Sequence, residues 1–339
     1  MRKRNVPPVP APGKQEGSGP EAGRAVRDQE QTGPVRVSVV AWVSLLIVWL
    51  VWGSTYLAIR VGVETIPPLL MAAARNLVAG LIMFPLALRS RRPAVRAAGQ
   101  ATRYRPTRAE WVGCAIVGIL LLVANGVVGV GEKTVPSGLA ALLVATVPLW
   151  LLGIDAGLNH ARLGLAPVAG LALGLAGVAL LSGLGGRSGG FSVVGVVIIL
   201  GAAAMWALGT IMARRVTIPD SPALASGMQL LSGGVALLVL AAATGEFGSL
   251  HLAQVSVRSW LALGYLIVMG SIVAFSAYGI AVRALPTTTV ATYAYVNPVI
   301  AVLLGTLILN ERLTPVMFGG GALIVGAVVL VVRRSPPAH

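Results

Sequence analysis

Apolar residues in this chain gather in long runs of about 20, and short polar stretches separate each run from the next. A helix of about 20 apolar residues crosses roughly 30 Å of hydrocarbon, so each run predicts a transmembrane helix. The pattern therefore predicts an all-α membrane protein with ten transmembrane helices. The runs lie at about 38–59, 67–88, 111–130, 137–157, 163–183, 192–213, 222–243, 259–281, 287–309 and 315–332.

Residues 1–36 precede the first run and are rich in proline, glycine and charged residues. Such a segment cannot bury enough apolar surface to offset the entropy lost when a chain becomes ordered. It does not resemble a secretory signal, because the first apolar run starts only after it, has full transmembrane length and lacks a small-residue cleavage site. We expect a disordered tail.

The composition agrees with lipid as the solvent for most of the chain. Hydrophobic residues make up 56% and charged residues 11%, whereas soluble domains have roughly 45–50% and about 25%. The net charge of +15 does not indicate a nucleic-acid partner, because Lys and Arg concentrate on one side of the predicted topology. The tail and the connection at 89–108 each hold seven basic residues, which places both termini in the cytoplasm. This connection could also bind anionic lipid headgroups, although a role in topology alone is simpler.

The chain contains an internal repeat. At an offset of 150 residues Pro136 falls on Pro286 and Pro148 on Pro298, and at an offset of 154 Trp52 falls on Trp206. We therefore expect two related halves of five helices, at 37–184 and 192–334. Because five is odd, the second half must cross the membrane in the opposite direction. Such inverted repeats support alternating access around a site at the middle of the membrane.

Several segments carry a family resemblance. WGSTYLAIRVGVETIPPLLMAAARNLVAG at 52–80, VPSGLAALLVATVPLW at 135–150, WALGTIMARR at 206–215 and ATYAYVNPVIAVLLGTLILNERLTP at 291–315 resemble signatures of the EamA branch of the drug/metabolite transporter superfamily. The resemblance implies ten helices, two EamA repeats and export of metabolites across a bacterial inner membrane. One position departs from the family pattern, because the acidic residue of the second half, Glu311, corresponds to Ala161 in the first.

Arg75 is the charged residue that lies deepest within a predicted helix. A charge there costs about 2.5–3.5 kcal/mol on insertion scales, so it should face the bundle interior or a water-filled cavity. Its planar guanidinium group is suited to clamp a carboxylate or phosphate of a solute. Bonds to backbone carbonyls or to a neighbouring helix end are an equal alternative. The repeat places Gln229 at the equivalent position, so a cavity would carry charge on one side only.

Further polar and aromatic residues are candidates for the same cavity. Trp52 and Tyr56 lie four residues apart on one helical face, and Trp206 is the equivalent of Trp52 in the second half. Tyr293 and Asn297 share a face of the ninth predicted helix. Rings with a polar edge suit a cavity for amphipathic solutes, although helix packing or interfacial anchoring explains them more simply. Interhelical hydrogen bonding accounts for the weakest candidate, Asn125. The others are Trp52, Tyr56, Trp206, Tyr293 and Asn297.

The sequence offers no catalytic motif. His-Glu-x-x-His and Gly-x-Ser-x-Gly are absent, and all three histidines lie outside the predicted spans. GVVGVGEKT at 126–134 departs from a phosphate loop at Glu132. We predict neither enzymatic activity nor a cofactor. Glu132 and Glu311 fall at the predicted membrane edges, so a carboxylate for proton exchange is missing from the middle of the helices. Uniport or exchange therefore deserves the same weight as proton coupling.

These features predict a secondary transporter that exports a small metabolite across the inner membrane by alternating access. The expected solute is an amino acid or another zwitterionic or anionic molecule. An efflux carrier for hydrophobic drugs is the first alternative, although Arg75 would repel cationic ones. A membrane scaffold or sensor that works through its basic segments is the second. Glycine-rich faces of the fifth and tenth helices favour packing within the chain over a homodimer, which stays a second possibility.

Overall fold

A computed structural model describes residues 39–90, 94–95, 101–102, 104–159, 165–181, 192–285, 287–290, 292–311 and 314–334. The predicted tail at 1–36 and the position of Ala161 lie outside these ranges, so the expectations for them stay predictions.

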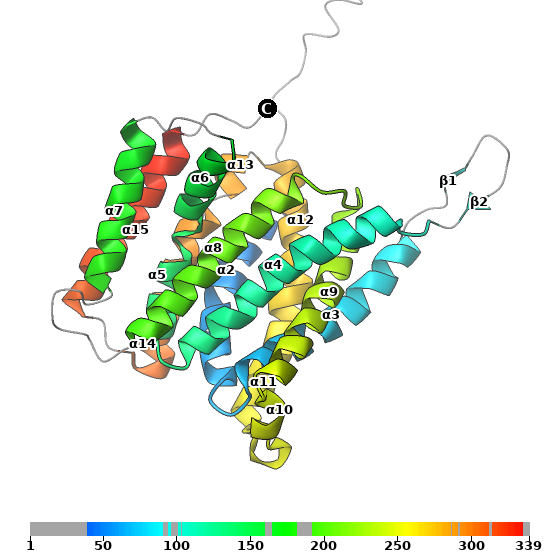
Figure 1. The fold of residues 1–339 in the computed structure, drawn as a ribbon, viewed down its shortest axis with the longest axis horizontal. Helices are drawn as coiled ribbons and strands as arrows, with labels where there is room; N and C mark the ends of the chain where they lie inside the picture. Colours follow the sequence, from blue (N-terminus) through cyan, green and yellow to red (C-terminus); the bar gives the residue numbers. More distant parts are fainter. Residues whose placement is uncertain are drawn as a thin grey trace, which may run out of the picture. The chain divides into compact units, whose positions relative to one another are not determined.

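The described residues form a helical bundle (Figure 1). Within the described part of the chain, the strands are limited to two residues each, in the connection between α3 and α4, where Ala94 pairs with Thr102. The first half contains α2 (Val39–Gly62), α3 (Pro68–Ser90), β1 (Ala94–Val95), β2 (Ala101–Thr102), α4 (Arg108–Glu132), α5 (Ser137–Val144), α6 (Val147–Leu158) and α7 (Leu165–Leu181). The second half contains α8 (Val193–Ala213), α9 (Pro222–Ala243), α10 (Glu246–Ser249), η1 (Leu252–Gln254), α11 (Val257–Tyr265), η2 (Leu266–Val273), α12 (Ala274–Ala284), α13 (Thr287–Val290), α14 (Tyr293–Leu309) and α15 (Pro315–Arg334).

Helices occupy all ten predicted ranges, but some of these helices are too short to count as membrane spans. Seven helical segments of the described chain are long and apolar enough to cross a membrane. Three more are shorter apolar helices, at Val168–Leu180, Val296–Leu309 and Pro315–Leu330. The ninth predicted run is shortened because it divides into α13 and α14. The helical fold is thus confirmed, whereas a count of ten spans stays a prediction.

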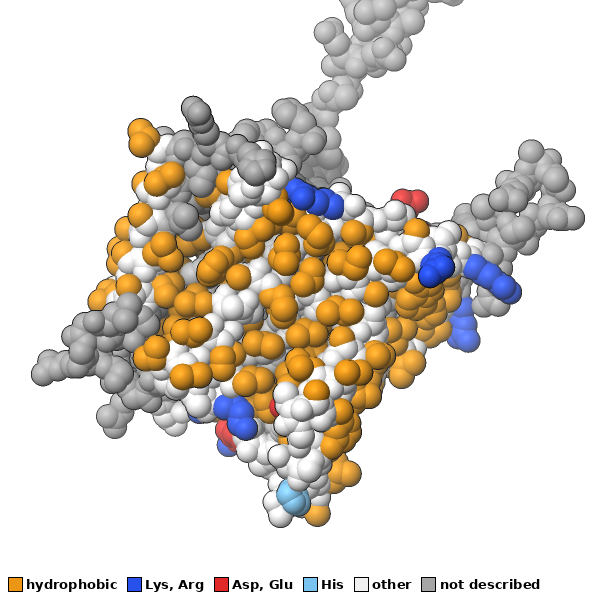
Figure 2. All heavy atoms as spheres, viewed as in Figure 1, with side chains coloured by type: hydrophobic (Ala, Val, Ile, Leu, Met, Phe, Trp, Pro, Cys, Tyr) orange, Lys and Arg blue, Asp and Glu red, His pale blue; other side chains and the backbone are white. Residues whose placement is uncertain are grey.

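The outer surface of the bundle is apolar. Figure 2 shows hydrophobic side chains over most of the visible face, with Lys and Arg near the ends of the bundle. Large exposed hydrophobic residues include Leu81, Val197, Val239 and Leu307. A soluble monomer rarely exposes an apolar patch of this extent, whereas lipid would cover it at no penalty.

The halves meet through equivalent helices that run antiparallel. A Cβ added to Gly80 of α3 would lie 2.9 Å from Cγ of Leu231 in α9, and one added to Gly234 of α9 would lie 2.8 Å from Cγ of Leu77 in α3. The offset of 154 residues converts the first contact into the second. A contact that is repeated with its partners exchanged is what a two-fold relation between the halves produces.

The pair α7 and α15 repeats this arrangement. Cβ atoms added to Gly174 and Gly177 would lie 3.5 Å from Cβ of Ala327 and 2.9 Å from Cγ1 of Ile324. The offset of 150 residues again exchanges the two contacts. Small residues allow close approach of helices in lipid, so the glycine-rich faces of these helices are used within the chain.

Close packing at such glycines predicts a measurable loss of stability. A Cβ on Gly118 of α4 would lie 2.4 Å from the carbonyl oxygen of Gln229, which is backbone of α9 and cannot move aside alone. We expect Gly118→Ala to lower the free energy of unfolding by about 1–3 kcal/mol. Gly201→Ala in α8 is the matched control, because nothing lies within 4 Å of its added Cβ. Thermal unfolding of the purified proteins in detergent compares them, and equal melting of both variants would contradict the packing.

Candidate functional site

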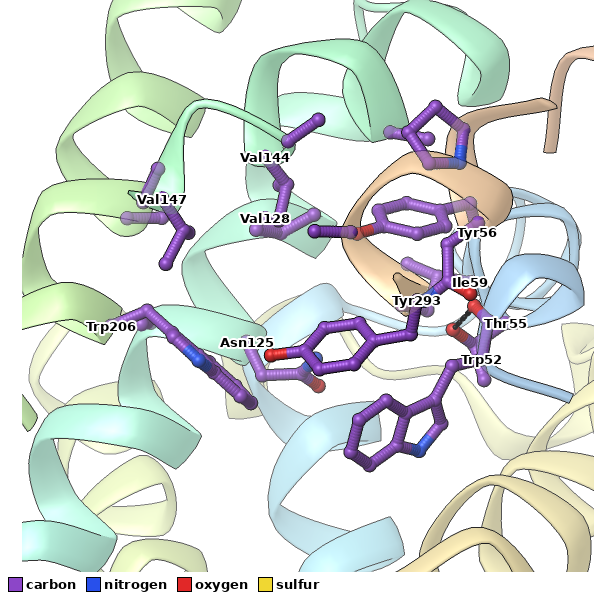
Figure 3. A pocket seen from close by; sticks show the side chains of 18 of the residues that line it. Trp52, Thr55, Tyr56, Ile59, Asn125, Val128, Val144, Val147, Trp206 and Tyr293 are labelled. Carbon is purple, nitrogen blue, oxygen red and sulfur yellow. Dashed lines mark hydrogen bonds between the residues drawn. The ribbon is translucent and has the colours of Figure 1, made fainter. Parts of the chain in front are cut away.

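A cavity of about 260 Å³ lies between helices of both halves (Figure 3). The first half contributes α2, α3, α4 and the α5–α6 segment to its wall. The second half contributes α8, α12 and α14. Seven of the eight candidate residues line it, namely Trp52, Tyr56, Arg75, Asn125, Trp206, Tyr293 and Asn297. The structure therefore brings together residues that lie up to 245 positions apart in the chain, as the difference 297 − 52 gives.

Gln229 is the candidate that the structure does not bring to the cavity. It is half-buried in α9, and its backbone packs directly against Gly118 of α4. Gln229 is not among the residues that line the cavity. The repeat relates Arg75 to Gln229 by sequence position, but of the two Arg75 alone lines the cavity.

Arg75 holds the polar corner of the cavity. It is only 5% exposed, and its Nε donates to Oγ of Ser271 at 2.9 Å while Nη1 donates to Oδ1 of Asn125 at 3.1 Å. Gly270 makes room for the guanidinium group, because a Cβ there would lie 3.1 Å from Nη2. A guanidinium group has five N–H donors, so three are left over from these two bonds. Within the described residues no carboxylate bonds to Arg75.

Asn76 is a further cavity residue, which the sequence did not lead us to expect. It follows Arg75 in α3, lines the cavity and is 2% exposed. Its amide nitrogen has no hydrogen-bond partner among the described residues. An amide group inside a predicted span was the available signal, since such a group needs a partner in lipid. Together, Arg75 and Asn76 give the corner an excess of donors over acceptors.

Asn297 contributes differently. In the orientation that satisfies its amide group, the nitrogen donates to the carbonyl oxygens of Trp49 and Tyr293, at 3.2 Å each. Asn297 thus ties α14 to α2 beside the cavity, and the unused donors described above belong to Arg75 and Asn76.

Aromatic rings form a second region of the cavity wall. Trp52 packs against Phe275, Tyr278 and Tyr293, with ring centroids 5.6, 5.2 and 5.4 Å away. Trp206 enters from α8 on the other side of the view in Figure 3. Edge-to-face and tilted arrangements of this kind stabilise aromatic pairs beyond simple burial. They also present ring faces to whatever occupies the cavity.

Repeated prolines shape the remaining wall. Pro148 in the first half and Pro298 in the second both line the cavity. Proline lacks an N–H group, so Pro298 leaves the carbonyl of Ala294 one turn earlier without its helical partner, and Ala294 also lines the cavity. In the first half the helix is interrupted between α5 and α6, just before Pro148. Both halves therefore weaken their helical hydrogen bonding beside the cavity.

Two carboxylates of the second half bond to the first half at one end of the bundle, where α4 ends and α5 begins. We call this the clasp end, and we call the contact of Glu311 with Ser137 and Gly138 the clasp. Glu311 accepts from the N–H and Oγ of Ser137 at 2.8 and 2.9 Å, and from the N–H of Gly138 at 3.2 Å. Glu246 accepts from the N–H of Leu70, in the first turn of α3, at 3.0 Å. A carboxylate at a helix N-terminus satisfies free N–H groups and complements the helix dipole. The clasp lies about one turn beyond the cavity residue Ala141.

Comparison with known proteins identifies relatives of the whole bundle. The EamA-like transporter family model matches residues 40–183 and 193–333. The chain is 38% identical over 292 residues to "Uncharacterized inner membrane transporter YedA" of Escherichia coli (strain K12), which covers 85% of this chain and 89% of that protein. It is 30% identical to "Uncharacterized transporter YvbV" of Bacillus subtilis (strain 168), over 86% and 92% of the two chains. It is 26% identical to "Probable amino-acid metabolite efflux pump" of Escherichia coli (strain K12), over 83% and 90%.

The two matched segments coincide with the two halves of the bundle, which confirms the family resemblance. The relatives are named as transporters, and the chain carries several helices that are long and apolar enough to span a membrane. These findings support a multi-pass membrane protein with a transport role rather than an enzymatic one. The chain belongs to the EamA-like transporter family.

Proposed function

We propose that this protein is a secondary transporter that exports a small metabolite bearing a carboxylate group, such as an amino acid, across the inner membrane. The observation that carries the proposal is Arg75, a buried cation with unused donors at the wall of a cavity between the two halves. A buried charge is strongly favoured to pair with an opposite charge. An anionic group of a solute can supply the negative charge that no described residue places against Arg75.

The remainder of the wall supports an amphipathic solute. The aromatic residues around Trp52 provide apolar surface, and Asn297 adds a polar amide group to the wall. Small-molecule sites commonly combine apolar walls with a few placed polar groups. The amino-acid efflux named for one relative agrees with such a solute.

We propose alternating access as the mechanism. The exchanged contacts of Gly80 with Leu231 and of Gly234 with Leu77 support an inverted pair, because equivalent helices run antiparallel. Five spans in each half, with both termini in the cytoplasm, would produce this inversion. The clasp end would then face away from the cytoplasm. Rocking of the halves would open the cavity at one end while the other stays closed.

Two other functions remain as alternatives. Cationic drugs would find favourable ring faces in the aromatic region, but Arg75 would repel their charge. A scaffold or sensor would depend on its basic segments and not on the cavity. Deletion of residues 1–36 separates these classes, because a carrier keeps its flux without the tail whereas a scaffold loses its partner.

Counterflow in proteoliposomes tests the proposal. Vesicles are preloaded with one unlabelled solute of a panel of zwitterionic, anionic and cationic metabolites, and uptake of the labelled form is followed. A carrier for carboxylates gives transient accumulation with zwitterionic or anionic solutes. Counterflow with cationic solutes alone would favour the drug carrier, and no counterflow with any solute would reject secondary transport of these classes.

The aromatic region makes a prediction of its own. Trp52→Ala removes a ring that contacts three others, and we expect an aromatic solute to lose about 2- to 10-fold in apparent affinity. Trp52→Phe should restore part of this loss. Trp42→Ala is the matched control, because Trp42 lies on the same helix and is exposed on the outside of the bundle. Equal loss in both alanine variants would show that Trp52 does not contact the solute.

A further inference from the structure

Glu132 is a buried acid that the proposed transport function does not use. It is the last residue of α4, its side chain is 0% exposed, and neither carboxylate oxygen has a hydrogen-bond partner among the described residues. The hydropathy pattern predicts Glu132 at a membrane edge, and the structure places it at the end of the helix. What the pattern did not predict is its burial: the end of α4 is covered by α8, where Ile199 and the backbone of Gly195 contact the preceding residue, Gly131.

Among the described residues, the surroundings of Glu132 contain few charges. Arg60 and Glu311 are the described charged groups that interact with its carboxylate, and Tyr56 of α2 is a further ionisable neighbour. The guanidinium group of Arg60 donates to the backbone carbonyl of Glu132, so this bond does not engage the carboxylate. Lys133 follows in the chain but is exposed. The sequences of α5 and α8, which pack nearby, contain no ionisable side chain.

These contacts determine which form of the acid is compatible with the closed clasp. An ionised carboxylate that is buried without a hydrogen-bond donor is far less stable than a neutral carboxyl group at the same place. Glu311 differs, because its carboxylate accepts three hydrogen bonds from Ser137 and Gly138. The negative charge of Glu311 further disfavours a second negative charge on Glu132. Arg60 is the described cation that opposes these effects.

We propose that Glu132 is a proton-binding site, which takes up one proton when the clasp end closes and releases it when that end opens. Opening would part the clasp around Ser137 and admit water to the end of α4, where a hydrated glutamate ionises at neutral pH. The proton that leaves enters the solvent on the clasp side. Tyr56 both interacts with Glu132 and lines the cavity, so the proton-binding site borders the solute site.

Infrared spectroscopy tests this proposal without any solute, so its outcome does not depend on the proposed transport activity. Full-length protein with ¹³C-labelled glutamate is placed in lipid nanodiscs at about pH 7, where ordinary glutamates are ionised. We expect wild-type protein to show the carbonyl band of a protonated carboxylic acid, shifted by the label. Glu132→Gln should lose this band. Glu64→Gln, which changes an exposed glutamate near the same end, should keep it.

Two results would overturn the proposal. The first is a wild-type spectrum with no label-sensitive carboxylic acid band at about pH 7, which decides the matter even if a variant fails to fold. The second is a band that persists unchanged in Glu132→Gln. A pH titration of the wild-type sample gives the result that supports the proposal. The carboxylic acid band should disappear reversibly at high pH as Glu132 ionises.

Discussion

Arg75→Ala is expected to lower the apparent affinity for anionic and zwitterionic solutes by about 10- to 100-fold, since a hydrogen bond to a charged group contributes about 1.5–3 kcal/mol. The variant removes the buried cation of the cavity and frees its partners, Ser271 and Asn125. Solutes without a negative charge should lose little. Initial rates of counterflow over a range of solute concentrations measure the effect.

Two further arginine variants sharpen this result. Arg75→Lys keeps the charge but loses the planar fork that can bind a carboxylate at two points, so we expect intermediate affinity. Arg258→Ala removes an exposed arginine at the clasp end and should behave as wild type. If Arg75→Ala carries every anionic solute as well as Arg258→Ala does, Arg75 does not bind the solute.

Glu311→Ala is expected to destabilise the protein by about 1.5–3 kcal/mol, the range for hydrogen bonds to a charged group. It removes the acceptor for the N–H groups of Ser137 and Gly138 and for the Ser137 hydroxyl. Because this clasp joins the second half to the first, its loss should also favour opening of the clasp end. Thermal unfolding in detergent measures the change in stability, and we expect a melting temperature lower by a few degrees.

Comparison with other acidic residues separates the clasp from general effects of charge. Glu246→Ala removes one hydrogen bond, from the N–H of Leu70, and should destabilise the protein less. Glu64→Ala removes an exposed glutamate and should be near neutral. A melting temperature of Glu311→Ala as high as that of Glu64→Ala would contradict a structural clasp.

The helices could largely be predicted from the sequence because their apolar runs match the length of a membrane span. The interruptions could not, since they depend on local geometry. The run at 137–157 contains a break before Pro148, whereas Pro298 lies inside α14 without ending it. The same residue type thus has two outcomes, and the surrounding packing decides between them.

The cavity could be predicted in outline because polar residues inside apolar helices must face the protein interior. Gln229 met the same criterion but does not line the cavity, so polarity within an apolar run does not by itself identify a cavity residue. Burial of Glu132 was not predicted either. Hydropathy places it at the end of a run, but the covering α8 comes from the other half of the chain.

The central claim is that the transported solute occupies the cavity between the two halves. Alkylation of a single cysteine tests it most directly, with Val144→Cys on the cavity wall and the native buried cysteine replaced by Cys114→Ser. We predict that a solute active in counterflow slows alkylation by a maleimide, with half protection at the concentration that half-saturates transport. A solute that is transported but leaves the rate of alkylation unchanged at saturation would contradict the claim.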